Sequence, residues 1–195
     1  DNAENAIVLC SSANQALTET QIDEALSGAG SDDWLLLQNE TNLGFYAATV
    51  AKSRGMRVAY AAAPFDAKAA LKMLPVTDLL AVNEIEAAQL SKALGVDADD
   101  LPVTQVLITR GAEGATLQED GKMISVDAFK VEPVDTTGAG DTFLGYFMAA
   151  IDMGLSPAEA LKRASGASAL QVTKAGAAEA IPVLADVQAF LAAQS

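Results

Sequence analysis

The sequence contains no histidine and a single cysteine, and both shortages exclude familiar kinds of chemistry. Without histidine, the chain cannot build a Ser-His or Cys-His catalytic pair or a histidine-based metal site. Cys10 has no second cysteine with which to form an internal disulfide bond, and a small buried residue is its simplest interpretation. No apolar run has the length of a membrane-spanning helix, and no charged and then apolar leader opens the chain. We therefore expect a cytoplasmic protein.

Positive charge is also scarce in this sequence. The 12 Lys and Arg residues stand against 26 Asp and Glu residues, which gives a formal net charge of −14. Such a negative surface argues against nucleic acids and anionic membranes as partners. A nucleotide would have to be held by local features such as helix N-termini and a metal ion.

The composition and the order of apolar segments indicate the fold class. The 195 residues are 51% hydrophobic and 19% charged, a balance that suits one globular domain, residues 1–195. Short apolar runs alternate with helical patterns, which predicts an α/β fold with a mainly parallel sheet. The predicted strands are residues 6–10, 34–38, 58–62, 78–82 and 103–109, then a hairpin of 115–119 and 123–127. The predicted helices are residues 18–27, 43–54, 67–74, 84–94, 139–153, 156–173 and 183–193. Unbroken apolarity predicts that the strand at residues 34–38 is fully buried.

One stretch, residues 134–143, combines a turn of small residues with a helix start. It reads Val-Asp-Thr-Thr-Gly-Ala-Gly-Asp-Thr-Phe, and Gly138, Ala139 and Gly140 let the backbone approach a ligand closely. The unpaired N–H groups and the positive dipole end of the helix predict an anion site, with phosphate as the usual guest. Asp141 at the same helix start is either a partner of the helix dipole or a base beside a phosphate. A plain glycine turn into a helix also fits Gly-x-Gly alone.

The full string Asp-Thr-Thr-Gly-Ala-Gly-Asp-Thr-Phe resembles the C-terminal signature of the ribokinase-like (PfkB) family of sugar kinases. The segments at residues 4–9, 13–14 and 35–40 are also similar to this family. The resemblance implies a ribokinase-like three-layer α/β sandwich with a mainly parallel central sheet. The family's first Gly-Gly signature, most of its sugar contacts and its β-lid have no counterpart here, so we expect an N-terminally truncated form of the fold.

The resemblance also implies a reaction, the transfer of the γ-phosphoryl group of ATP to a sugar hydroxyl, with ribose as the expected sugar. Asp141 is then the catalytic base that contacts this hydroxyl, and Gly138, Ala139 and Gly140 supply backbone donors to the phosphoryl group. Phosphoryl transfer needs charge stabilisation, positioning and a proton acceptor, which such a site could provide. The alternatives are a family member acting on fructose, a nucleoside or a vitamin precursor, and a nucleotide-binding fragment without activity. A homodimer is possible for the complete enzyme.

Two further motifs follow predicted strands and have both structural and functional interpretations. Asn83 and Glu86 have the spacing of a capping box, while the family has an Asn-x-x-Glu motif here that supports binding of Mg²⁺ and phosphate. Thr109, Gly111 and Gly114 lie in a segment that could be only a turn. The resemblance makes these three residues contacts of the nucleotide.

The resemblance implies roles for a last group of residues. Glu40, otherwise a surface acid, would bind sugar hydroxyls, and Ser165 would lie near the adenine. A monovalent cation such as K⁺ would be held, mostly through carbonyl groups, by Asp135, Thr137, Gln171, Lys174 and Gly176. Ala180 stands where the family commonly has serine. The structural interpretation of the segment at 173–177 is that Lys and Gly satisfy the last carbonyl groups of a helix.

Overall fold

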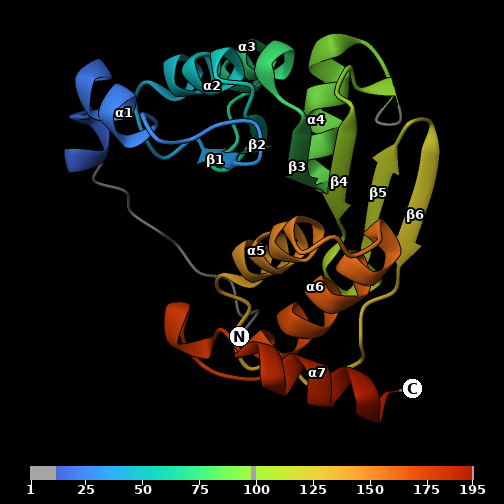
Figure 1. Cartoon of the computed structure of the whole chain (residues 1–195). Coiled ribbons are helices and arrows are strands. Elements are labelled where there is room, and N and C mark those ends of the chain that lie inside the picture. Colours follow the sequence, from blue (N-terminus) through green and yellow to red (C-terminus); the bar gives the residue numbers. More distant parts are fainter. Residues whose placement is uncertain (1–11, 98–99, 195) are drawn as a thin grey trace. The chain divides into compact units, whose positions relative to one another are not determined.

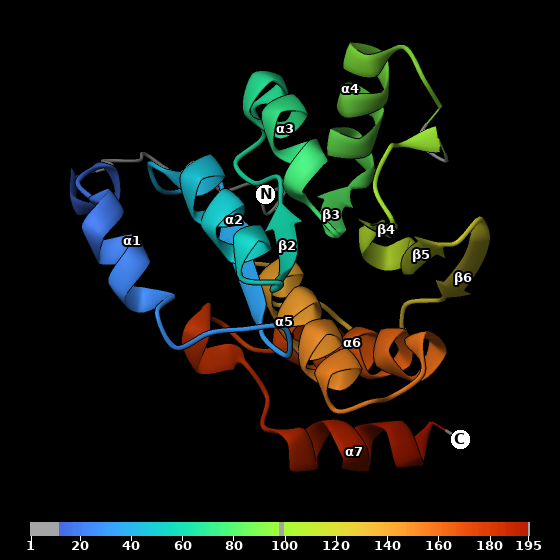
Figure 2. The ribbon, with the colours of Figure 1, turned by 45° about the horizontal axis from the view of Figure 1, so that its top comes forward.

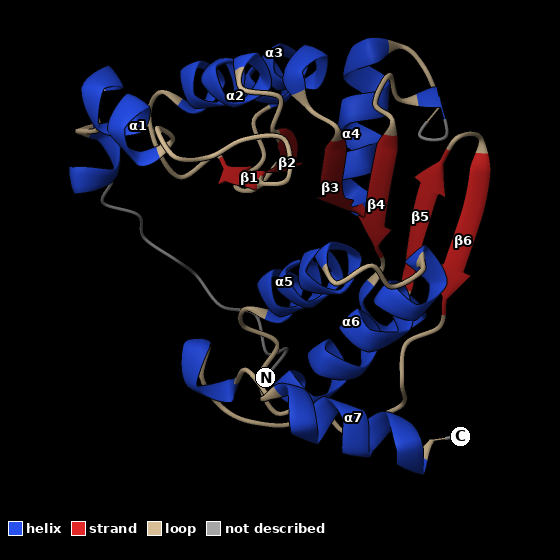
Figure 3. Cartoon of the chain, viewed as in Figure 1, coloured by secondary structure: helices blue, strands red, loops and turns tan. Residues whose placement is uncertain are grey.

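The computed structural model of the protein describes residues 12–97 and 100–194; the predicted strand at residues 6–10, with Cys10, lies outside them. Within the described residues, six strands form one sheet in the order β1-β2-β3-β4-β5-β6 (Figure 3). Helices separate the first four strands in the chain. These observations confirm the predicted α/β class.

The chain divides into two compact units (Figure 1). Of the described residues, the N-terminal unit comprises 12–97, 100–108 and 118–120, and the C-terminal unit comprises 109–117 and 121–194. The first elements are α1 (Glu19–Ala25), β1 (Trp34–Gln38), α2 (Gly44–Ser53), β2 (Arg57–Ala61), α3 (Ala67–Met73), β3 (Leu79–Asn83), α4 (Glu84–Leu94) and β4 (Gln105–Thr109). The later elements are β5 (Ala115–Glu119), β6 (Lys122–Val126), α5 (Ala139–Asp152), α6 (Pro157–Val172) and α7 (Leu184–Ala193). That the whole chain is one domain stays a prediction.

The first strands of the sheet are parallel. Strand β1 pairs with β2 from Trp34↔Arg57 onward, and β2 pairs with β3 from Ala59↔Leu79 onward. The expectation that β1 is fully buried is wrong, because Leu36 keeps 45% of its surface exposed. Leu35 and Leu37 pack against the core, whereas Leu36 between them points to the opposite face of the sheet. In the described part of the chain, β1 stands at the end of the strand order and has a neighbour on one side only.

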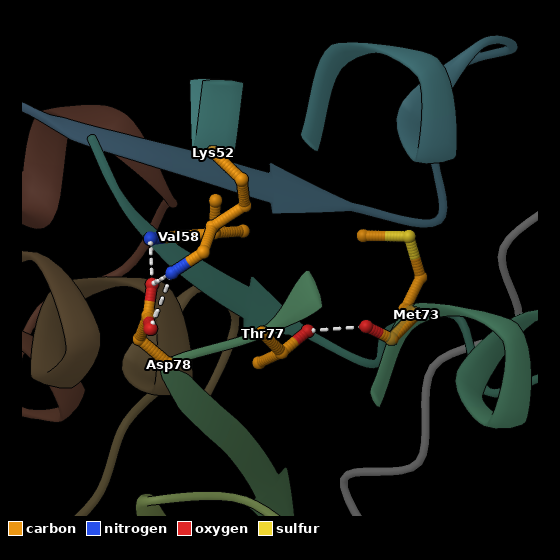
Figure 4. Close-up of polar contacts among 5 residues, drawn as sticks. All are labelled: Lys52, Val58, Met73, Thr77 and Asp78. Carbon is orange, nitrogen blue, oxygen red and sulfur yellow. Dashed lines mark hydrogen bonds and ion pairs between the residues drawn. The ribbon is translucent and has the colours of Figure 1, made fainter. Parts of the chain in front are cut away.

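The carboxylate of Asp78 fixes how β2 and β3 begin in the N-terminal unit (Figure 4). Its Oδ2 accepts a hydrogen bond from the Val58 N–H at 2.8 Å, and the Asp78 N–H donates to the Val58 carbonyl at 2.9 Å. Lys52 of α2 forms an ion pair with the same carboxylate at 2.7 Å. A partly exposed ion pair contributes at most about 1 kcal/mol, so the reciprocal contact with Val58 matters more for the register.

Capping residues explain where several helices begin. Thr18, Asn83 and Ser156 each accept a hydrogen bond from the N–H three residues later, and each is bonded in return by that residue's side chain. These three capping boxes satisfy N–H groups that have no partner within the helix, which stabilises each helix by about 1 kcal/mol. They confirm the predicted starts of α1, α4 and α6.

The C-terminal unit is built around α6, which packs against α5 and α7 (Figure 2). The predicted core stripe of α5 is confirmed for Phe143 and Phe147, which are buried, whereas Ile151 is only half-buried. Gly166 of α6 allows the close approach of α7, because a Cβ there would lie 2.8 Å from Leu191 Cδ2. In the described part of the chain, no helix has the length and apolar character needed to cross a bilayer.

Strands β5 and β6 form the predicted hairpin, with the second strand starting one residue earlier than predicted. The turn is Asp120-Gly121, with positive φ angles of 50° and 71°. Two positive φ angles in a two-residue turn match the right-handed twist of a hairpin, and an Asp-Gly pair is well suited to them.

Gly114, at the entry to this hairpin, cannot carry a side chain. Its φ is +99°, and a Cβ would lie 2.0 Å from the Val126 carbonyl oxygen and 2.9 Å from Ala128 N. We expect Gly114→Ala to lower the free energy of unfolding by about 3–5 kcal/mol. Alanine is strained at this φ, and its Cβ would also force the clashing backbone atoms to move. Urea unfolding measures the loss. The control is Gly121→Ala, which has φ +71° but no atom within 4 Å, and should cost about 1 kcal/mol. Equal losses of unfolding free energy in the two variants would contradict the claim that a clash at Gly114 is costly.

Candidate active site

The turn before α5 has the backbone conformation that an anion site needs. Gly138 is the N-cap residue of α5 with φ 73° and ψ 6°, a left-handed conformation that favours glycine. The Thr142 N–H donates to the Gly138 carbonyl at 2.9 Å, which closes the first helical turn. The Ala139 N–H, one of the three predicted donors to a phosphate, donates instead to the Thr136 carbonyl at 3.2 Å, so it already has a partner within the turn. The helix behind this turn has 14 residues, so its dipole favours negative charge at the turn.

Asp141 occupies the third position of α5, and its side chain is exposed. An exposed carboxylate in the first turn of a helix is favoured electrostatically and can also accept a proton from a nearby hydroxyl group. The structural and the catalytic interpretations of this residue therefore remain compatible.

A pocket of about 440 Å³ lies beside this turn, entirely within the C-terminal unit. Four predicted nucleotide contacts line it together, namely Thr109, Gly111, Gly114 and Ser165. Two of the predicted phosphate donors, Ala139 and Gly140, line the same pocket. The volume is within the range of small-molecule sites. The structure therefore joins residues that are 56 positions apart in the sequence, from 109 to 165, around one cavity.

Most of the remaining lining is apolar, and sequence patterns did not reveal it. These side chains come from an irregular segment after β6 and from α5 and α6: Phe129, Val131, Pro133, Phe143, Ala169 and Val172. A largely apolar lining of this kind suits an aromatic base. The one available signal was the run of small residues at 164–169, which allows a ligand to approach α6.

Two serines of α6 connect this pocket to the surrounding backbone. Ser165 is buried, and its hydroxyl donates to the Asp127 carbonyl at 3.2 Å. The Ser168 hydroxyl donates to the Ala139 carbonyl at 3.2 Å, which ties α6 to the first turn of α5. Ser165 thus has a structural partner in addition to its position on the pocket wall.

The Asp135 carboxylate holds the segment that leads into the turn. Its Oδ1 accepts from the Thr137 N–H at 2.9 Å, and its Oδ2 accepts from the Gly176 N–H at 3.0 Å. Hydrogen bonds from the Thr137 side chain and N–H, and from the Gly176 N–H, lower the pKa of Asp135. The Val134 and Asp135 N–H groups both donate to the Val172 carbonyl, at 2.7 and 3.1 Å. The segment before Gly138 is therefore fixed to the end of α6.

The residues expected around a monovalent cation are only partly arranged for it. Asp135, Thr137, Gln171 and Gly176 lie together, and Lys174 is exposed. The Thr137 carbonyl already accepts from Gln171 Nε2 at 2.8 Å, and the Gln171 carbonyl accepts from the Lys174 N–H at 2.9 Å. A carbonyl oxygen that already accepts an N–H donor has only one lone pair left, so it is a weaker ligand for a cation than a free carbonyl. The cation stays a prediction that this arrangement does not favour.

Asn83 and Glu86 belong to the N-terminal unit, where they form the capping box of α4. Asn83 Oδ1 accepts from the Glu86 N–H at 2.9 Å, and Glu86 Oε2 accepts from the Asn83 N–H at 2.8 Å. Burial raises the pKa of Glu86, and the hydrogen bond from Asn83 opposes this rise. The second carboxylate oxygen is outside the capping box, so this chemistry fits a group that orients the waters of Mg²⁺. Among the described residues, no group of three or more Asp, Glu, Cys or His side chains could hold a metal alone.

Glu40 also belongs to the N-terminal unit and lies exposed in the turn after β1. A pocket of about 350 Å³ is lined by its neighbours Asn39 and Thr41 but not by Glu40 itself. Asn39 is held there, since its Oδ1 accepts from the Tyr60 hydroxyl at 2.7 Å and its amide donates to the Pro64 carbonyl at 3.0 Å. Within the described part of the chain, Glu40 has no buried partner that would indicate a sugar site.

Comparison with known proteins gives these sites a family context. Residues 1–184 match the model of the pfkB family of carbohydrate kinases. The chain is 34% identical over 202 residues to the ribokinase of Haemophilus influenzae, covering 97% of this chain and 66% of that protein. The ribokinase of Lactococcus lactis is 30% identical over 193 residues, covering 96% and 63%. The chain thus spans less than two thirds of the length of these curated relatives.

Solved structures show the same fold. Thermotoga maritima ribokinase has a TM-score of 0.82 at 32% identity, covering 97% of this chain and 66% of that one. Arabidopsis thaliana ribokinase, solved with ribose and ATP, has a TM-score of 0.80 at 29% identity, covering 96% and 65%. The predicted ribokinase-like α/β fold is confirmed. With a family model that matches most of its length, the chain belongs to the pfkB family of carbohydrate kinases.

Proposed function

We propose that the protein is an ATP-dependent sugar kinase that transfers the γ-phosphoryl group of ATP to a hydroxyl group of ribose. The observation that carries this proposal is the pocket of the C-terminal unit, where four predicted nucleotide contacts and two predicted phosphate donors line one cavity. The family membership and the ribose and ATP of the Arabidopsis relative support it. A cytoplasmic location and a homodimer belong to the same proposal.

The nucleotide binds with its base in the apolar part of the pocket, which Phe129 and Val172 help to line and where Ser165 contributes a polar group. Its phosphates extend toward Ala139 and Gly140 at the start of α5. There the helix dipole stabilises negative charge, and the Gly140 N–H is proposed as a donor to the phosphates. Because this donor is fixed by the backbone, it needs no reorganisation when charge moves during transfer.

Asp141 accepts the proton of the attacking sugar hydroxyl. Its position in the first turn of α5, one residue beyond the pocket residue Gly140, supports this role. Loss of this proton makes the hydroxyl oxygen a stronger nucleophile, and the bond from that oxygen to phosphorus forms as the bond to ADP breaks. When bound, Mg²⁺ would neutralise phosphate charge, and Glu86 is the residue proposed to orient its waters. Glu40 is proposed to contact sugar hydroxyls.

A panel of sugars tests the substrate. ADP release from the full-length gene product is measured with ribose, deoxyribose, fructose and a nucleoside as acceptors. We expect kcat/KM for ribose to exceed that for deoxyribose by about tenfold or more, since a site built for a hydroxyl rejects an analogue that lacks it. The value for ribose should also exceed those for fructose and the nucleoside. A higher value for another acceptor would replace ribose within the same family. Tight ATP binding without acceptor-dependent ADP release would instead identify a nucleotide-binding protein without turnover.

A further inference from the structure

The side chain of Gln171 has no role in the proposed reaction, yet it is one of the most buried polar groups in the described part of the chain. It lies in the last turn of α6 with 0% of its surface exposed. A buried amide is retained only when its donors and its acceptor all find partners, because each unmet group costs free energy. Its partners therefore indicate what it does.

All polar atoms of the Gln171 amide have partners around the phosphate turn. Nε2 donates to the Thr137 carbonyl at 2.8 Å and to the Ala177 carbonyl at 3.4 Å. Oε1 accepts a hydrogen bond from the hydroxyl of Thr142, which is itself buried. The orientation of the amide follows from these partners, because two backbone carbonyl oxygens can only accept. One side chain thus joins the segment before the turn, the loop after α6 and the first turn of α5.

The amide also touches the turn itself. A Cβ added to Gly138 would lie 2.9 Å from Gln171 Nε2, so the amide packs directly against the α-carbon of Gly138. Among its partners, the amide bonds the carbonyl of Thr137, just before this glycine, and the hydroxyl of Thr142, four residues after it. Gln171 therefore fixes the backbone on both sides of the position where the phosphates are proposed to bind.

We propose that the Gln171 amide is a positioning group that replaces a monovalent cation beneath the phosphate turn, so that this protein works without K⁺. The physical reason is that converging carbonyl dipoles repel one another unless positive charge lies between them. A cation supplies a full positive charge, whereas the two N–H donors of the Gln171 amide supply partial positive charge to the Thr137 and Ala177 carbonyls without an ion. Ala180, which is buried and apolar, offers no side-chain oxygen to a cation in the same loop.

Thermal unfolding of the full-length gene product without ATP tests this inference. The inference rests on the proposed function only in calling this turn a phosphate site, because thermal unfolding does not depend on catalysis. For the unchanged protein, we expect the same Tm in KCl and in choline chloride of equal ionic strength. The dissociation constant of ATP should also be the same in both salts.

Removal of the amide should create a response to cations. We expect Gln171→Ala to lower Tm by about 5–10 °C in choline chloride, because a buried hydrogen-bonded group is lost. KCl should then restore part of this loss saturably and more effectively than NaCl, since the freed carbonyl groups can bind the ion. The control is Gln188→Ala on α7, where the side chain is exposed and neither loss nor rescue is expected. Gln171→Met, which keeps the volume without the amide, provides the same readout if the alanine variant does not fold.

Two results would overturn the inference. A saturable rise of Tm with KCl in the unchanged protein would mean that a cation binds beside Gln171. A lower Tm in the Gln171 variants that KCl does not raise more than NaCl would mean that Gln171 contributes only to packing. Failure of the sugar assay would leave both melting results unaffected, so the two proposals can fail separately.

Discussion

Replacing Asp141 by asparagine should reduce kcat of the full-length gene product by about 10²–10⁴-fold, the usual contribution of a positioned general base. The dissociation constant of ATP should change by less than about threefold, because the proposed contacts of the nucleotide come from the backbone turn and the pocket. Asparagine has nearly the same shape as aspartate but cannot accept the hydroxyl proton. Steady-state kinetics and calorimetry with ATP measure the two effects.

Asp186 provides a matched control for this variant. It occupies the third position of α7, as Asp141 does in α5, and is also exposed. Asp186→Asn should therefore cost the same helix-dipole energy, about 0.3–1 kcal/mol, while leaving kcat unchanged. If Asp141→Asn left kcat unchanged, as Asp186→Asn should, Asp141 would be only a helix-dipole partner.

The second large effect is expected from Gly138→Ala. Alanine would be strained at φ +73°, and its Cβ would lie 2.9 Å from Gln171 Nε2, so the turn and the amide must separate. We expect a loss of about 1–3 kcal/mol in the free energy of unfolding and at least about tenfold weaker ATP binding. Urea unfolding and calorimetry measure these changes on the same preparation.

Gly145→Ala separates this local effect from a general effect on α5. Gly145 lies in the same helix and is exposed, and a Cβ added to it would meet no atom within 4 Å. Alanine is the better helix former, so this variant should be unchanged or more stable by up to about 1 kcal/mol, with normal ATP affinity. An unaltered ATP affinity in Gly138→Ala would remove the turn from nucleotide binding.

Local sequence signals predicted the elements of this fold well, because caps and glycine ends act over three or four residues. Asn83 with Glu86 and Ser156 with Glu159 are reciprocal caps in the structure, and α4 has the bounds that its sequence predicted. The burial of β1 could not be predicted in the same way. Whether Leu36 is covered depends on which strands and helices lie beside it, and apolarity alone does not determine that.

Parts of the candidate site that are encoded by a short sequence motif could be predicted, whereas parts that depend on contacts between distant residues could not. The Gly138–Gly140 turn has a compact motif, and Thr109 with Gly111 follows a strand end. Phe129 lines the pocket from an irregular segment with no periodicity, so no pattern pointed to it. The Gln171 side chain bonds the carbonyl of Thr137, which is 34 residues away in the sequence, and no local pattern could predict this contact.

The central claim is that the turn at Gly138–Gly140 binds the phosphates of a nucleotide. The most direct test is a ¹H–¹⁵N NMR titration of the ¹⁵N-glycine-labelled protein with ATP and, in parallel, with adenosine. The sequence has 14 glycines, and Gly121 at the hairpin tip serves as the internal reference. We predict that ATP shifts the amide signals of Gly138 and Gly140, that adenosine shifts Gly111 without them, and that Gly121 does not move. Saturating ATP with unmoved signals of Gly138 and Gly140 would contradict the claim.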